Sequence, residues 1–217
     1  MKGVTFGALH SYRDLGLILQ PGKEIGSPEV KKKELDIEGA DSSLDYTDFF
    51  GGPKYSNLTH KFPFAMIVPT ADFPSHFSRI KNALHGKKVR IILDDDPAFY
   101  YVGRCFVQPG TIDKGIGKVT IECDCEPYKY KLTETVVSKA VSGTDKIVLT
   151  NGRKHAVPEV VIANSATTMR IEYQGVNIWD LANGSYTLPE LELVEGNNTV
   201  TVTGTGTVTF KWQEGDL

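Results

Sequence analysis

Three consecutive aspartates, Asp94, Asp95 and Asp96, interrupt two apolar runs in the segment ILDDDPAFYYVGRC, residues 92–105. Carboxylates bind hard cations and serve as general acids and bases, so this cluster is the first candidate for chemistry. A cation site would need further oxygen ligands, and an EF-hand loop would also need a mid-loop glycine and a late glutamate. The four residues that follow, PAFY, supply none of these.

A structural explanation fits the same residues. Asp96 and Pro97 match the first two positions of a type I turn, and aspartate favours turns. The apolar runs on both sides have the composition of strands. We therefore expect a hairpin at the aspartates, with no acid–base or metal site.

The three cysteines form a second candidate site. Cys123 and Cys125 would place two sulfurs on one face of a strand, and Cys105 could lie on the neighbouring strand. Three thiolates are one ligand short of a structural zinc set, and the C-x-C spacing is shorter than usual. An odd count without a secretion signal argues against disulfides. We expect three buried free thiols that pack as small apolar side chains.

The remaining motifs are weaker. Residues 110–119, GTIDKGIGKV, resemble a phosphate-binding loop, but Ile112 replaces its first glycine and Val119 its magnesium-binding Ser or Thr. Trp179 and Trp212 could stack on sugars, although tryptophan in a sandwich belongs more often to the core. We expect surface or capping roles for the scattered histidines, which are His10, His60, His76, His85 and His155. No catalytic residue, cofactor site or metal site is predicted, and an enzyme is not expected.

Composition excludes several classes of protein. Of 217 residues, 40% are hydrophobic and 24% charged, as in ordinary globular proteins. Residues 1–132 hold 18 Lys and Arg against 17 Asp and Glu, and residues 133–217 hold 6 against 10, so neither part is basic enough for nucleic-acid binding. The one basic run, residues 31–34, is expected to be a solvated strand end. No apolar run approaches the ~20 residues of a membrane span, and the N-terminus lacks a signal-peptide core, so we expect folding in a cytoplasm.

The sequence changes character near residue 132. Before it, Phe77, Ile80 and Leu84 form one apolar stripe that predicts a helix starting near Asp72 and ending near Gly86. Strand-like runs flank this helix and predict a mostly antiparallel sheet with one packed helix. They are residues 57–68, 87–93, 98–107 and 117–132.

The second part consists of short runs rich in Thr and Val, punctuated by Gly and Asn, which is typical of an antiparallel β-sandwich. We place the boundary in residues 131–143, a polar stretch without a strong period. The prediction is a mainly β chain whose first domain, residues 1–132, is a mostly antiparallel sheet with one packed α-helix. A small β-sandwich, residues 133–217, would follow it.

Four N-terminal segments, in this order and spacing, resemble phage distal tail (Dit) proteins, the baseplate-hub components of long non-contractile tails in phages and prophages of Gram-positive bacteria. The C-terminal residues 191–212, LELVEGNNTVTVTGTGTVTFKW, resemble the closing hairpin of that family. The four N-terminal segments are residues 3–19, 36–57, 80–104 and 125–130.

The resemblance implies both a fold and a function. It implies an N-terminal β-sandwich-like domain that forms a hexameric ring around the tail channel, and a galectin-like β-sandwich outside the ring. The ring would join the major tail (tube) protein to the tail-tip protein and hold receptor-binding proteins. Such a protein would lie at the tip of the virion tail, after assembly in the host cytoplasm. The resemblance also implies that the three aspartates form the tip of a hairpin.

One alternative remains open at this point. The C-terminal domain could be a carbohydrate-binding adhesion module that contacts the host cell wall. Its short length leaves no room for the inserted carbohydrate-binding modules of larger relatives, which argues against direct sugar binding. Exposed aromatic side chains beside polar groups would favour the alternative, and burial of Trp179 and Trp212 would disfavour it.

Overall fold

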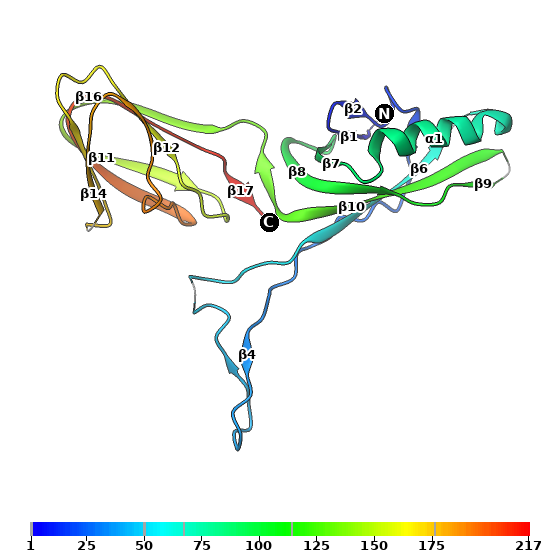
Figure 1. Cartoon of the computed structure of the whole chain (residues 1–217), viewed down its shortest axis with the longest axis horizontal. Helices are drawn as coiled ribbons and strands as arrows, with labels where there is room; N and C mark the ends of the chain where they lie inside the picture. Colours follow the sequence, from blue (N-terminus) through cyan, green and yellow to red (C-terminus); the bar gives the residue numbers. More distant parts are fainter. Residues whose placement is uncertain (1, 50, 67, 114, 176) are drawn as a thin grey trace. The chain divides into compact units, whose positions relative to one another are not determined.

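The computed structural model describes residues 2–49, 51–66, 68–113, 115–175 and 177–217. The chain divides into two compact units, Met1–Lys129 with Leu217, and Tyr130–Asp216. Almost all regular structure is strand, and α1 (Phe73–Leu84) is the one α-helix of the described residues (Figure 1). This confirms the mainly β fold class with β-sandwich-like units.

The first unit is built on an antiparallel sheet with the strand order β2-β1-β7-β8-β10-β6-β3, and β9 also pairs with β10. The helix-flanking runs predicted as strands form β6, β7, β8 and β10 of this sheet. The bounds are β1 (Val4–Phe6), β2 (Leu9–His10), β3 (Leu17–Leu19), β6 (Leu58–Met66), β7 (Lys88–Leu93), β8 (Asp96–Val107), β9 (Thr111–Asp113) and β10 (Ile116–Lys131).

The hairpin predicted at the aspartates is present, but its turn lies three residues earlier than expected. Asp94 and Asp95 connect β7 to β8, and Leu93 pairs with Asp96. The predicted turn at Asp96 and Pro97 is wrong, because both residues belong to strand β8. Proline is compatible with the start of a strand, where its missing N–H costs no ladder hydrogen bond.

Helix α1 forms as its sequence predicts. Asp72 occupies the N-cap position, a proline lies in the first turn, and Gly86 just beyond the C-cap has a φ of 77°. Ile80 and Leu84 are buried against the sheet. Burial of each such side chain contributes roughly 1.5–3 kcal/mol, so the apolar stripe fixes the helix on the sheet.

A close approach of helix and sheet requires a glycine at position 117. A Cβ atom there would lie 2.7 Å from ring carbons of Phe73 and 3.3 Å from Met66. Gly117 belongs to β10, and its buried neighbours Val119 and Ile121 alternate with exposed residues. This alternation defines the helix-covered face of β10, and the residues between these positions must lie on the opposite face.

Between β3 and β6 the chain forms an arm, residues 30–55, bounded by the isolated bridge that pairs Val30 with Tyr55. It carries the two-stranded sheet of β4 (Glu34–Leu35) and β5 (Leu44–Asp45), the former labelled in Figure 1. Every residue from 29 to 46 is exposed. The arm therefore has no buried core of its own over this stretch.

The second unit is a curled antiparallel sheet with the order β14-β13-β16-β12-β15, in which β11 pairs with β16 along its whole length. Its core combines β12 and β13 with both halves of β16. The bounds are β11 (Thr135–Asn151), β12 (Glu159–Ala163), β13 (Met169–Tyr173), β14 (Asn177–Leu181), β15 (Gly184–Thr187), β16 (Gly196–Trp212) and β17 (Gly215–Asp216).

Strand β16 organises this unit because its two halves have different partners. Residues 200–203 pair with β13, and residues 207–211 pair with β12. Gly204 lies between them and pairs with Gly143 of β11. The absence of side chains at this register position leaves the β11–β16 ribbon free to bend, so that both halves contribute to one core.

One sequence prediction for this unit is wrong. The closing hairpin expected within residues 191–212 is one continuous strand, β16. The chain divides between Lys129 and Tyr130, close to the stretch 131–143 in which we placed the boundary, and most of that stretch forms the first half of β11. This half of β11 pairs only with β16. Val137 and Val141 on one of its faces pack against the core, whereas the residues between them are largely exposed.

Candidate interaction surface

Asp94 holds the N-terminal segment to the hairpin tip. Its Oδ2 accepts a hydrogen bond from the Gly3 N–H at 2.8 Å and lies 3.1 Å from His10 Nε2. The N–H groups of Tyr12 and Arg13 both donate to His10 Nδ1, so Nε2 must carry the proton and donate to Asp94. Burial raises the pKa of Asp94, but the hydrogen bonds from His10 and Gly3 outweigh it and the net pKa is lowered.

The other two aspartates have different partners. Asp95 forms ion pairs with Lys2 at 2.6 Å and with Lys23, and these hydrogen bonds lower its pKa to about 2. Asp96 pairs with Lys129 at 3.1 Å. Across the described residues, no group of three His, Cys, Asp or Glu side chains is placed to hold a metal ion. The triplet thus connects three separate segments to one hairpin.

The cysteines lie together in the core of the first unit, as predicted. All three are buried and free, and the Sγ atoms of Cys105 and Cys123 are 3.5 Å apart. The hydrogen bond with Cys105 and burial both raise the pKa of Cys123, and burial raises that of Cys125 to about 12. Cys123 and Cys125 are therefore neutral near pH 7, whereas nucleophilic or metal-binding sulfur is a thiolate.

The prediction of surface or capping histidines is wrong for His10 and His60, which are both buried. His60 Nδ1 accepts the Gly26 N–H at 3.1 Å, its ring packs edge-on against Tyr101, and Nε2 has no hydrogen-bond partner. Burial lowers the pKa of His60 to about 4, so the ring is neutral at physiological pH. His85 does cap α1, as expected.

The glycine-rich stretch and the two tryptophans, which were also candidate sites, are parts of the fold. Residues 110–119 contribute β9 and the start of β10, which pair antiparallel, so no helix follows the glycine-rich stretch as a phosphate-binding loop requires. Trp212 is 2% exposed, and Trp179 is half-buried against the core of the second unit. Trp212 therefore offers no open face on which a sugar would stack, and the packing of Trp179 against the core covers part of its ring.

The arm has an apolar face that the sequence analysis missed. Leu35 and Leu44 are direct cross-strand partners and therefore lie on one face of the β4–β5 ribbon, while Glu34 and Asp45 pair on the other. Isolated two-stranded hairpins are marginally stable in water, and opposed like charges weaken this one further. Its exposed large hydrophobic residues up to position 46 are Val30, Leu35, Ile37, Leu44 and Tyr46.

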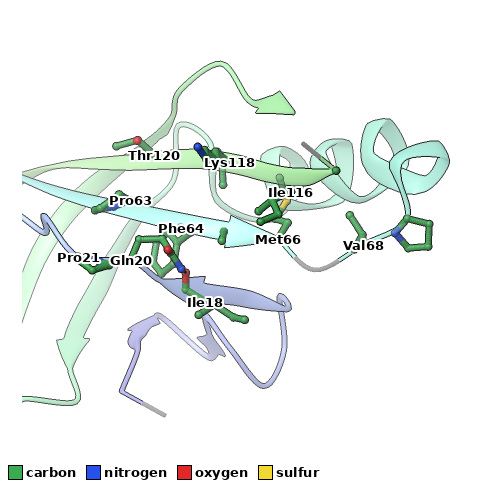
Figure 2. Close-up of a pocket in the computed structure, with 14 residues that line it drawn as sticks. Ile18, Gln20, Pro21, Pro63, Phe64, Met66, Val68, Ile116, Lys118 and Thr120 are labelled. Carbon is green, nitrogen blue, oxygen red and sulfur yellow. The ribbon is translucent and has the colours of Figure 1, made fainter. Parts of the chain in front are cut away.

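A second apolar surface lies on the sheet of the first unit. It is a recess of about 880 Å³ on β3, β6 and β10, shown in Figure 2. Ala65 of β6 pairs with both Ile18 of β3 and Lys118 of β10, which places one side chain from each strand in a row. By the alternation of β10, this row faces away from α1. Six of its lining residues are Ile18, Pro21, Pro63, Ala65, Ile116 and Lys118.

Sequence signals for these two surfaces were present but incomplete. The alternation of acidic and apolar residues in 34–38, ELDIE, indicates a strand with one apolar face, although not that this face stays exposed. The recess depends on the pairing of β3 with β6, which lie far apart in sequence. Only the three-dimensional register brings its residues together.

Comparison with known proteins identifies the fold. No family model and no curated protein sequence matches the chain. Among solved structures, the crystal structure of the Dit protein of phage SPP1 matches with a TM-score of 0.72 and 18% sequence identity, covering 100% of both chains. That protein is described as a paradigm of the hub adsorption apparatus in phages that infect Gram-positive bacteria. The chain therefore has the fold of a Dit protein, as the sequence resemblance implied.

Proposed function

We propose that the protein is a structural component of a phage or prophage tail, forming the hub ring of the distal tail. This ring would join the tail tube to the tail-tip protein and to receptor-binding proteins. The observation that supports this most is the end-to-end correspondence with the SPP1 Dit protein, because it includes both units of the chain. The protein would then belong to the virion tail tip, after assembly in the host cytoplasm.

The surface of the first unit supports a role in assembly. Exposed apolar patches on a folded protein mark interaction sites, and this unit carries both the arm and the recess. We assign ring formation to residues 1–132 and an outer, galectin-like sandwich to residues 133–217. The exposed large apolar residues of the second part are scattered along the chain, namely Val136, Val148, Val157, Ile178, Val194 and Leu217.

The candidate chemical groups favour a non-enzymatic role. The aspartates form ion pairs with separate segments, and the thiols of Cys123 and Cys125 are buried and neutral. The sugar-binding alternative loses its main support, since Trp212 is buried and Trp179 packs against the core. Within the described residues, no helix is long and apolar enough to cross a membrane.

Light scattering on the full chain, alone and with the tail tube protein of the same phage, tests the proposal. Assembly follows mass action, so the measurement needs a concentration series. We expect a hexamer, either free at high concentration or bound to the tube protein. A chain that stays monomeric and does not bind the tube protein would contradict the proposal.

A further inference from the structure

The recess is an open part of a sheet whose other face is covered. On the covered face, Gly117 lies under Phe73 of α1. On the opposite face, Ile18, Ala65 and Lys118 form the cross-strand row described above. Antiparallel sheets tolerate one solvated face, but such a face normally carries polar side chains. Here the lining is mostly apolar, and Ile116 beside the row is about half exposed.

The charge of the recess is complementary to that of the β4–β5 ribbon of the arm, and the four lysines of the arm lie outside this ribbon, at positions 31–33 and 54. Lys118 is the only charged residue among the described residues that line the recess, and it pairs with Asp113 at 2.8 Å. Residues 34–45 of the arm contain five acidic residues and no basic one. The arm also presents Leu35 and Leu44 side by side, the side-chain type that an apolar recess of this size accepts.

We propose that the recess on β3, β6 and β10 receives the apolar face of the arm of a second copy of the chain. This inference rests on the ring proposed above and names the two surfaces that meet in it. Leu35 and Leu44 enter the recess near Ile18 and Ile116, and the acidic residues of the arm lie near Lys118. The β4–β5 ribbon gains from this contact the covered face that it lacks within its own copy.

The geometry of such a contact predicts a closed assembly. The arm and the recess are different surfaces of one chain, so each copy can give its arm to one neighbour and accept the arm of another. Contacts of this head-to-tail kind generate rings when the rotation between copies closes. A self-complementary pairing of two arms would stop at a dimer instead.

Two full-chain variants separate the surfaces. The arm variant is Leu35→Glu with Leu44→Glu, and the recess variant is Ile116→Glu with Lys118→Glu. All four side chains are exposed in the single copy, so neither variant removes core packing. Val148→Glu, an equally exposed position in β11, is the control for an added surface charge.

Analytical ultracentrifugation distinguishes this contact from other ways in which the copies could associate. Each double variant should self-associate at least about thirtyfold more weakly than wild type, as for loss of an interface hot spot, while Val148→Glu should assemble normally. An equimolar mixture of the two variants should form 1:1 heterodimers and nothing larger, because only one arm–recess pair remains intact.

Three results would overturn the inference. If the recess variant assembles like wild type, the arm binds elsewhere and the ring proposal stands without this contact. If both variants are monomeric and their mixture stays monomeric, the two surfaces do not meet. If the wild-type chain never assembles, with or without the tail tube protein, the ring proposal fails and the contact fails with it.

Discussion

His10 Nε2 donates a hydrogen bond to the Asp94 carboxylate at 3.1 Å, and this contact links the N-terminal β-hairpin to the tip of the β7–β8 hairpin. The same carboxylate oxygen also accepts the Gly3 N–H. Asp94 is therefore both a turn residue and the acceptor that holds the N-terminal segment to the hairpin tip.

Replacing Asp94 by Ala should destabilise the first unit by about 1 kcal/mol, because the Gly3 N–H and the buried His10 both lose their acceptor. The side chain is 32% exposed, which limits the effect through solvent screening. Urea unfolding measures this change. Asp145→Ala, which removes a surface ion pair with Lys139 in the second unit, is the matched control and should change stability less. Equal effects of the two substitutions would argue against the role assigned to Asp94.

The stability of the protein should fall as the pH drops from about 6.5 toward 4, and His60 should account for a large part of the loss. Its pKa is about 4 in the folded chain, against an ordinary value of 6.5. The unfolded chain therefore binds a proton in this window that the folded chain excludes, and stability is fully present only above the window. The shift corresponds to roughly 3 kcal/mol at its acidic end.

Urea unfolding of wild type and His60→Phe at pH 7, 5 and 4 tests this expectation. The variant loses the acceptor for the Gly26 N–H, so it should be less stable at pH 7. Its stability should nevertheless depend less on pH than that of wild type between pH 6.5 and 4. A variant with an unchanged pH slope would show that another group titrates there.

The three thiols should be unreactive in the folded protein. Cys105, Cys123 and Cys125 are buried, and the raised pKa values of Cys123 and Cys125 keep these two thiols protonated at pH 8. The hydrogen bond with Cys123 lowers the pKa of Cys105, so burial alone protects this thiol from the reagent. Ellman's reagent should label no cysteine under native conditions and three in denaturant. Rapid labelling of even one thiol in the native protein would contradict this packing.

Gly117→Ala should destabilise the first unit by about 1–3 kcal/mol, because the new methyl group would lie 2.7 Å from the Phe73 ring. A smaller residue at position 73 should relieve the clash, so Phe73→Leu should cost less in the Gly117→Ala background than in wild type. The coupling free energy of this double-mutant cycle is the measurement. Strictly additive effects would place the helix farther from β10 than the structure does.

Local sequence signals predicted the helix and the strands whose own residue pattern marks one apolar, buried face. The Ile80 and Leu84 stripe located α1, and the β-branched runs located strands in both units. Elements whose form depends on pairing with residues far away in the sequence were not predictable in this way. Residues 191–212 were expected to form a hairpin because they resemble the closing hairpin of the Dit family, but residues 196–212 form one continuous strand paired with β11.

The candidate sites show the same division. The thiol cluster was predictable because strand alternation places Cys123 and Cys125 on one face. The burial of His60 was not, because it depends on the packing of Tyr101 from a different strand and on the Gly26 N–H. The apolar face of the arm was missed because Leu35 and Leu44 stay exposed among the described residues, whereas sequence patterns of this kind normally indicate a buried face.

The central claim is that this chain forms the hub ring at the end of a tail tube. Negative-stain electron microscopy of the purified full chain mixed with tail tubes of the same phage tests it most directly. The account predicts a six-fold ring with a central channel, attached to one end of each tube. Tube ends that stay bare, with the chain remaining as single copies, would contradict it.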